Sequence, residues 1–195
     1  MIVLASSSPR RRELLQQIGV PFRIQVQAVD ETPRPAELPA AYVARLALEK
    51  ARAVSALNPG AVVLGADTTG VLADQILVKP EDDADARRML QAMSGRTHQV
   101  LTAVALVQDE REQVRVVRTE VTFCPLTDEQ IRAYVATGEP ADKAGAYGIQ
   151  GFGAVLVAGI NGSYSNVVGL PLTETAAMLR EFRIPIWQQD PSREC

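Results

Sequence analysis

Three arginines stand at the start of a predicted helix near the beginning of the chain. Ser8 is a favoured N-cap residue, and Pro9 suits the first helical position. The first turn therefore holds Arg10, Arg11 and Arg12, although a helix N-terminus is already partly positive. One interpretation is a solvated arginine run whose repulsion is tolerated. Three arginines behind a strand and a serine loop instead favour a phosphate site built from backbone N–H groups, hydroxyls and guanidinium groups.

Asp67 is the strongest candidate for acid–base chemistry. It follows a predicted buried strand over residues 61–65, and open α/β sheets place their ligands beyond such strand ends. The preceding Gly65 and Ala66 leave room around its carboxylate. A carboxylate in this position can hold a divalent metal or activate a water molecule. The alternative is an Asp that only caps a turn.

Further acids and cations accompany Asp67. Asp30 and Glu31 follow a predicted strand, Lys50 lies on a predicted helix, and Lys79 stands beside a predicted hairpin. Taken singly, each is typical of a solvated surface residue. Together they supply acids for a metal and cations for a polyphosphate, which are the two requirements of phosphoanhydride cleavage.

A glycine-rich segment over residues 145–153 is the second candidate ligand site. Its four glycines would let the backbone approach a ligand closely, and Gln150 offers both an amide donor and an acceptor. The alternative is a flexible loop before a hairpin, with Asn161 and Gly162 as the turn. His98, the only histidine, is interpreted as a structural hydrogen-bonding residue rather than a base.

The elements that must position these residues alternate along the chain. Strands are predicted at residues 2–5, 22–28, 61–65, 98–107 and 114–123, and helices at 9–18, 40–57, 81–94, 127–137 and 171–182. Hairpins are predicted around residues 73–75 and 161–162. Strand–helix alternation followed by hairpins predicts a mixed α/β sheet with helices on both faces.

Composition sets the class of protein. The chain has 195 residues and a net charge of −3, which argues against nonspecific binding to nucleic acid or an anionic membrane. Cys124 and Cys195 show no metal or redox spacing and suggest a reducing compartment, with Cys124 expected to be buried. The apolar runs are too short for a signal peptide or a membrane helix. We therefore expect a cytoplasmic location.

From end to end, the sequence resembles the Maf nucleoside triphosphate pyrophosphatases. The matching segments are residues 4–11, 30–31, 48–51, 65–68, 79–80, 94–98, 138–140, 142–151 and 168–172. The resemblance implies one domain over residues 1–195 with a Maf/ITPase-like, two-lobed α/β fold and a central cleft. It also implies hydrolysis of a nucleoside triphosphate to the monophosphate and pyrophosphate, with a divalent metal such as Mg²⁺ or Mn²⁺. Residues 142–151 resemble the subgroup that acts on dTTP and UTP.

The resemblance also assigns roles. Asp67 corresponds to the proton acceptor. From their acid chemistry, we expect Glu31 and Asp67 to hold the metal. Base selectivity is tied to Arg11, Thr68 and Gln150. The remaining polar residues of the expected cleft are Ser6, Arg10, Glu31, Lys50 and Lys79.

Two alternatives stay open. One is a pyrophosphatase of the sister subgroup, which is selective for 7-methyl-GTP. The other is a nucleotide-binding cell-division regulator with little turnover. In each case we expect a nucleotide ligand and neither nucleic acid nor membrane as a partner, and a homodimer is left open.

Overall fold

The computed structural model describes residues 1–188, so Cys195 lies outside the described residues. These residues form two compact units, each built from separate segments of the chain. Unit 1 contains Met1–Asp67, Thr102–Val117 and the residues from 169 onward, and unit 2 contains Thr68–Leu101 and Arg118–Val168. Whether the two units make up one domain, as the resemblance implies, stays a prediction.

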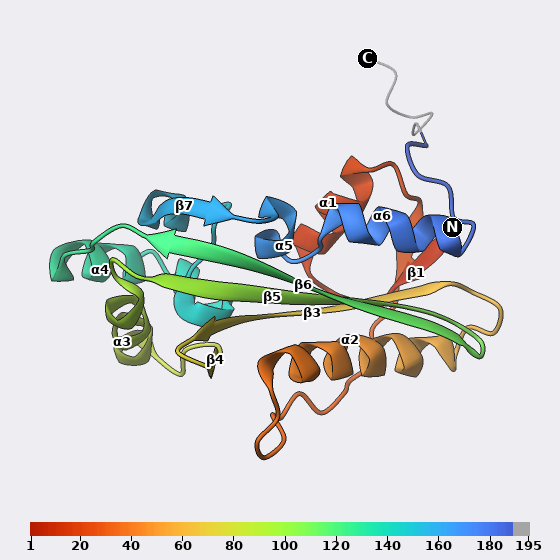
Figure 1. Ribbon diagram of the computed structural model, residues 1–195, viewed down its shortest axis with the longest axis horizontal. Coiled ribbons are helices and arrows are strands. Elements are labelled where there is room, and N and C mark those ends of the chain that lie inside the picture. The colour runs from red at the N-terminus through yellow and green to blue at the C-terminus, as the bar shows by residue number, and fades with distance from the viewer. Residues whose placement is uncertain (189–195) are drawn as a thin grey trace. The chain divides into compact units, whose positions relative to one another are not determined.

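Within residues 1–188, seven strands form one mixed sheet (Figure 1). They are β1 (Ile2–Leu4), β2 (Phe22–Ile24), β3 (Val63–Leu72), β4 (Gln75–Leu77), β5 (Thr97–Gln108), β6 (Arg111–Phe123) and β7 (Val157–Asn161). The order is β2-β1-β3-β5-β6-β7, with β4 paired to β3. Strand β1 is parallel to β2 and β3, whereas β4 is antiparallel to β3 and β7 to β6. The predicted mixed α/β sheet is confirmed, and the central cleft stays a prediction.

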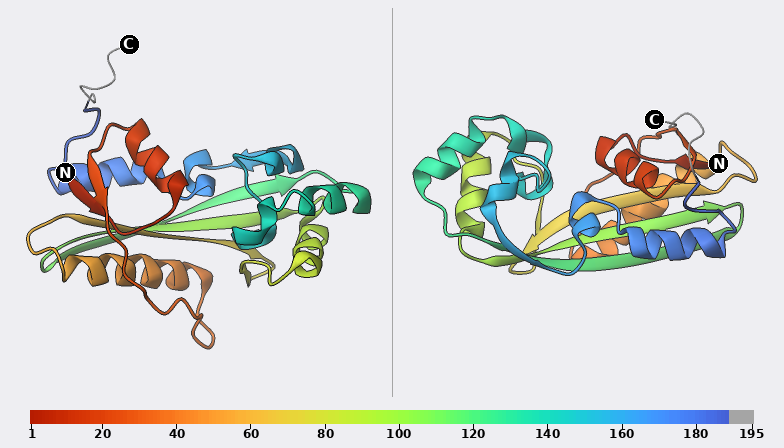
Figure 2. Two further views of the ribbon diagram at one scale, coloured as in Figure 1. Left: turned by 180° about the vertical axis from the view of Figure 1, so that it is seen from behind. Right: turned by 90° about the horizontal axis from the view of Figure 1, so that it is seen from above.

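Helices cover both faces of the sheet in unit 1. They are α1 (Pro9–Gln17), α2 (Pro39–Ser55) and α6 (Leu172–Glu181). Helix α2 lies on one face, and α1 and α6 lie on the other (Figures 1 and 2). The apolar stripe of α2, which includes Val43, Leu46 and Ala47, is fully buried. Burial of that stripe holds the helix against the strands.

Helix α1 begins as predicted, with Ser8 at the N-cap and Pro9 in the first position. The Ser8 side chain nevertheless makes no capping hydrogen bond. Instead, the Ser8 N–H donates to the Ser6 hydroxyl at 3.3 Å. The serine loop therefore folds back on Ser6.

Strand β2 is shorter than the period-two alternation of residues 22–28 predicted. Its partner β1 is only three residues long and pairs Ile2 with Phe22 and Leu4 with Ile24. One more bond follows, from the Gln25 N–H to the Leu4 carbonyl at 3.1 Å. After Leu4 the chain continues into the serine loop. The alternating residues that follow Gln25 therefore find no continuation of β1 to pair with.

Unit 2 has its own core. Its helices are α3 (Asp83–Met93), α4 (Asp128–Val135) and α5 (Tyr164–Val168), with the 3₁₀ helices η1 (Glu139–Asp142), η2 (Ala144–Ala146) and η3 (Phe152–Leu156). The buried side chains include Leu90 and Met93 of α3, Phe123 of β6 and Ile131 of α4. A capping box begins α4, because the Thr127 hydroxyl and the Gln130 side chain bond each other's backbone N–H groups.

One predicted hairpin is confirmed and one is wrong. Strands β3 and β4 pair around Ala73 and Asp74, both of which have positive φ as a tight hairpin turn requires. Around Asn161 and Gly162, however, β7 pairs with β6 and the chain continues into helix α5. The Ser163 N–H donates to the Thr119 hydroxyl at 3.0 Å, and this bond to β6 takes the place of a returning strand.

The single histidine is structural, as predicted. His98 is 2% exposed, and its Nε2 lies 2.9 Å from the Tyr147 hydroxyl. Burial lowers its pKa to about 4.

Cys124, expected to be buried, is only half-buried. In the described part of the chain, every helix is too short or too polar to span a membrane.

Candidate active site

Asp67 lies on β3 in unit 1, where its carboxylate is held by a lysine from α2. Only 8% of the residue is exposed. The Lys50 ammonium donates to Asp67 Oδ1 at 2.7 Å. A second carboxylate, Glu31 Oε1, lies 2.7 Å from the same Lys50 Nζ. The structure therefore brings together three of the residues predicted from the sequence, with one ammonium between two carboxylates.

A close approach of α2 to β3 sets this geometry. A Cβ added at Gly65 would lie 2.2 Å from the Ala47 carbonyl oxygen and 2.9 Å from the Ala51 nitrogen. Only glycine allows this separation. Lys50 is one turn beyond Ala47, and Asp67 is two residues beyond Gly65, so the close contact places the two side chains together.

The loop that carries Glu31 is tied to the same helix. The Tyr42 hydroxyl donates to the Glu31 carbonyl at 2.9 Å, and Arg45 Nη2 donates to the Thr32 carbonyl at 3.2 Å. Arg45 also bonds Glu37 through two nitrogens at 2.6 and 2.7 Å. This bidentate pair lowers the pKa of Glu37 to about 2. Helix α2 thus fixes both ends of the loop and presents Glu31 to Lys50.

Arg11 joins the cluster from α1. Its Nη1 donates to the Ser6 hydroxyl at 3.1 Å, and its Nε donates to the Gly169 carbonyl at 2.9 Å. Burial lowers the pKa of Arg11, and the nearby Asp67 charge opposes that shift. Arg10 is the next residue on the helix and is half-buried. Ser6 and Arg11 therefore lie together at the start of α1, and Arg10 is near enough for its charge to help lower the pKa of Arg11.

The electrostatics of Asp67 reflect a balance. Burial raises its pKa, while the charges of Lys50 and Arg11 pull it down and Glu31 adds to the rise. A carboxyl group with a raised pKa is a better proton acceptor than an ordinary aspartate. The arrangement suits a general base held in place by a lysine.

The acidic side chains of the site determine whether it could hold a divalent metal. Within residues 1–188, no three His, Cys, Asp or Glu side chains are grouped to hold a metal. Mg²⁺ is commonly bound by one or two carboxylates together with substrate phosphates. Glu31 and Asp67 already gather around one cationic group, Lys50 Nζ. Two carboxylates around a cation fit a hard metal that completes its shell with phosphate oxygens.

The other predicted site residues belong to unit 2. Thr68 is half-buried and follows Asp67 along β3, and Gln150 is exposed in the glycine-rich segment. Lys79 is exposed and follows Val78, whose carbonyl accepts the Gly145 N–H at 3.1 Å. The structure thus places Lys79 beside the start of that segment.

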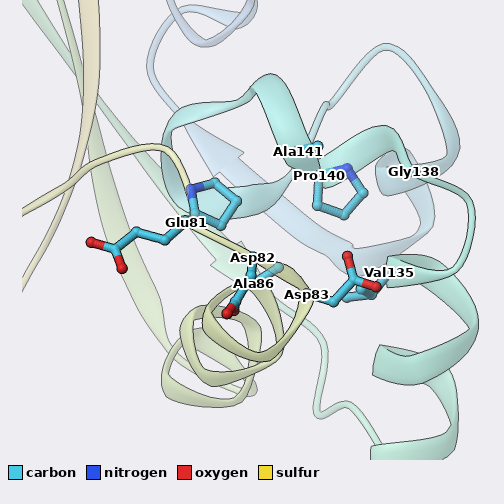
Figure 3. Close-up of a pocket in the computed structure, with 9 residues that line it drawn as sticks. Glu81, Asp82, Asp83, Ala86, Val135, Gly138, Pro140 and Ala141 are labelled. Carbon is cyan, nitrogen blue, oxygen red and sulfur yellow. The ribbon is translucent and has the colours of Figure 1, made fainter.

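A pocket elsewhere in unit 2 contains none of the predicted site residues. Its volume is about 110 Å³, and it lies between the start of α3 and the segment around η1 (Figure 3). Glu81, Asp82 and Asp83 contribute to its lining. Three carboxylates would repel a triphosphate, so this pocket does not suit the nucleotide.

The sequence matches a known protein family and several named relatives over most of its length. The Maf-like protein family model matches residues 1–182. The chain belongs to the Maf-like family. A Symbiobacterium thermophilum relative named dTTP/UTP pyrophosphatase is 58% identical over 95% of this chain and 96% of its own length.

Two further Maf relatives carry the same name. The Moorella thermoacetica protein is 57% identical, over 95% of this chain and 97% of its own length. The Myxococcus xanthus protein is 53% identical, over 95% of this chain and 94% of its own length. The family resemblance inferred from the motifs is therefore confirmed.

Sequence reasoning missed several residues that support the site of this Maf-like chain. Tyr42 and Arg45 hold the Glu31 loop, and the Gly169 carbonyl holds Arg11. Tyr42 could have been found, because it stands eight residues before Lys50 and so lies on the same helical face. The Gly169 carbonyl left no such signal, since any residue supplies a carbonyl.

Proposed function

We propose that this protein is a nucleoside triphosphate pyrophosphatase that hydrolyses dTTP and UTP to the monophosphate and pyrophosphate. The observation that carries the proposal is the buried Asp67 carboxylate, held 2.7 Å from Lys50 in a chain whose Maf relatives are named dTTP/UTP pyrophosphatases. A proton acceptor beside cationic groups is what attack of water on a phosphoanhydride requires.

The roles of the unit 1 residues follow from their chemistry. Asp67 takes a proton from the water that attacks the α-phosphorus. Arg10, Arg11 and the Ser6 loop bind phosphate oxygens at the start of α1. Lys50 neutralises negative charge that grows on the leaving pyrophosphate.

The proposed metal would be held by Glu31 and Asp67. We expect Mg²⁺ or Mn²⁺, which when bound neutralises phosphate charge and polarises the phosphoryl oxygens. Support comes from the hard oxygen donors of the two carboxylates and from their convergence on one cation. Lys50 is then a second positive charge beside them.

Three residues are assigned to recognition of the base. Gln150 can pair with the acceptor–donor edge of uracil or thymine through its amide. Arg11 and Thr68 are the other two positions that the family resemblance ties to selectivity. In unit 2, Lys79 adds positive charge for the phosphates.

The partners follow from the same proposal. A nucleotide is the expected ligand, and the net charge of −3 disfavours nonspecific contact with nucleic acid. We propose a cytoplasmic location on the basis of the cysteine usage. Measurement of the mass in solution would decide whether the protein forms a homodimer.

The test is a panel of dTTP, UTP, CTP, ATP and 7-methyl-GTP with separation of the products. We expect dTTP and UTP to be the best substrates and to yield monophosphate and pyrophosphate. Formation of diphosphate and orthophosphate would contradict attack at the α-phosphorus. A preference for 7-methyl-GTP would move the protein to the sister subgroup, and binding without turnover would support the regulator.

A further inference from the structure

The segment that carries Gln150 folds around the carboxylate of Glu139, the first residue of η1. Glu139 Oε2 accepts the Phe152 N–H at 2.8 Å. Glu139 Oε1 accepts the Gly153 N–H at 2.9 Å. These two backbone groups follow Gln150 by two and three residues. One side chain thus fixes the chain just after Gln150.

Tyr134 extends the attachment to the chain before Gln150. Its hydroxyl donates to Glu139 Oε1 at 2.8 Å and accepts the Gly148 N–H at 3.1 Å. Tyr134 is itself buried in the core of unit 2. The Tyr134–Glu139 pair therefore holds backbone groups on both sides of Gln150, and α4 anchors the pair.

Two glycines of the segment, Gly151 and Gly153, lie directly against this pair. A Cβ added at Gly151 would lie 2.0 Å from Glu139 Oε2. A Cβ added at Gly153 would lie 2.7 Å from the Tyr134 hydroxyl. With Tyr134 and Glu139 in their observed positions, a side chain at either residue would collide with the pair.

The carboxylate is charged when it makes these bonds. Burial alone would raise the pKa of Glu139, but the bonds from Gly153, Tyr134 and Phe152 outweigh burial and lower it. Hydrogen bonds to an ionised acceptor are stronger than bonds between neutral groups. The segment is thus held by three charge-assisted bonds from different donors.

We propose that Glu139 is a positioning residue for base selection. It holds residues 148–153 in one conformation, so that Gln150 meets the base in a fixed place. Loss of the Glu139 charge should therefore weaken discrimination between bases more than it weakens turnover. This inference rests on the proposed function, because it takes Gln150 as the residue that reads the pyrimidine.

The kinetic test compares Glu139→Gln with the matched control Glu129→Gln, which removes the same charge from an exposed position on α4. Values of kcat/KM are measured for dTTP, UTP and CTP. In Glu139→Gln we expect the preference for dTTP over CTP to fall about tenfold, with kcat for dTTP changed less than about threefold. The control should keep the wild-type preference. An unchanged preference in Glu139→Gln overturns the inference.

Coupling to Gln150 distinguishes positioning from a general loss of structure. If Glu139 acts through Gln150, adding Glu139→Gln to Gln150→Ala should cost no further discrimination. Full additivity of the two changes would overturn the inference. Tyr134→Phe, which keeps the ring in the core and removes only the hydroxyl, should reproduce the effect if Glu139→Gln does not fold.

A readout independent of activity separates this inference from the proposed function. Amide hydrogen exchange at Phe152 and Gly153 should be about tenfold faster in Glu139→Gln than in wild type or in Glu129→Gln. Unchanged exchange would overturn the positioning role even in an active enzyme. Faster exchange in a protein that does not hydrolyse dTTP or UTP would support the attachment of residues 148–153 to Glu139 but reject the proposed function.

Discussion

At the scale of residues, charge balance dominates the candidate active site. Two cations, Arg11 and Lys50, face two carboxylates, Glu31 and Asp67. Asp67 is buried and Arg11 and Lys50 are half-buried, so leaving any of these three charges without its partners would be costly. The cluster is nearly neutral by itself, so a bound triphosphate brings negative charge that further cations must offset. This is the physical reason to expect a metal in addition to the lysines.

The first prediction concerns the proposed proton acceptor. Asp67→Asn keeps the shape of the side chain but cannot accept the proton of the attacking water. We expect turnover of dTTP to fall about 100- to 10,000-fold, as is typical when a general base is lost. The measurement is kcat at saturating nucleotide and metal, together with nucleotide affinity, which should change far less.

Asp74→Asn is the matched control for Asp67→Asn. Asp74 lies in the exposed β3–β4 turn, where its positive φ is one that Asn also tolerates. The control should retain wild-type turnover. A folded Asp67→Asn protein with normal turnover would remove Asp67 from the role of base.

The second prediction concerns Lys50 and the metal. Lys50→Met leaves Glu31 and Asp67 without their shared ammonium, and removal of one partner of a buried pair costs about 3 kcal/mol or more. We therefore expect a lower Tm without metal. Because the two carboxylates then lack that counter-charge, added Mg²⁺ should raise the Tm of Lys50→Met more than that of wild type. An equal or smaller rise in the variant would argue against metal binding by these two acids.

At the scale of elements, the contact between α2 and β3 determines the site. Lys50 and Asp67 come together because Gly65 lets the helix backbone approach the strand. The same helix carries Tyr42 and Arg45, which hold the Glu31 loop. Helix α2 is therefore the element that assembles the acidic side of the site.

The third prediction tests this contact. In Gly65→Ala, the new methyl group would meet the Ala47 carbonyl at 2.2 Å, so α2 must move away from β3. We expect a loss of about 1–3 kcal/mol in the free energy of unfolding, as for overpacked cores, and a fall in kcat larger than the rise in KM. Denaturant unfolding and steady-state kinetics measure the two effects.

Gly159→Ala is the control for Gly65→Ala. Gly159 lies on β7, and nothing stands within 4 Å of an added Cβ. Its stability and activity should match wild type. If Gly65→Ala behaves like Gly159→Ala, the close contact does not set the position of Lys50.

The elements also show where sequence reasoning works and where it fails. Local signals predicted the start of α1 at Pro9 and the start of α4 next to Thr127, because helix starts depend on residues a few positions apart. The turn signal at Asn161 failed because bonds from Thr119, far away in sequence, direct the chain into α5. Strand β2 ended early because its partner was short.

The site itself was predictable only in part. Asp67, Lys50 and Glu31 could be named from their residue types and their resemblance to a family. Their convergence depends on the register of α2 against β3, which residue types do not reveal. No signal in the sequence indicated the role of Glu139 either. Its carboxylate bonds to the backbone N–H groups of Phe152 and Gly153, and almost any residue supplies such a group.

At the scale of the whole molecule, two groups with shifted pKa values lie in different units and predict different responses to acid. His98 lies in unit 2 with a pKa of about 4, below its ordinary value of 6.5. In unit 1, the pKa of Glu37 is about 2, below its ordinary value of 4.5. Between pH 6.5 and 4 the unfolded chain binds a proton at His98 that folded unit 2 does not accept. Acid therefore destabilises unit 2 in that range, whereas the Glu37 contribution to unit 1 is lost only between pH 4.5 and 2.

The last prediction follows from these two different pH ranges. As the pH falls from 6.5 toward 4, the free energy of unfolding of unit 2 should decrease by up to about 3 kcal/mol, since one pKa unit corresponds to about 1.4 kcal/mol. Hydrogen exchange followed in peptides from both units at pH 7 and pH 5, corrected for intrinsic rates, should show unit 2 opening more at pH 5 while unit 1 changes little. In His98→Gln, which cannot titrate, the pH dependence of unit 2 should flatten. If unit 1 opened more than unit 2 at pH 5, or if unit 2 of His98→Gln kept the pH dependence of wild type, some other group would control the response to acid.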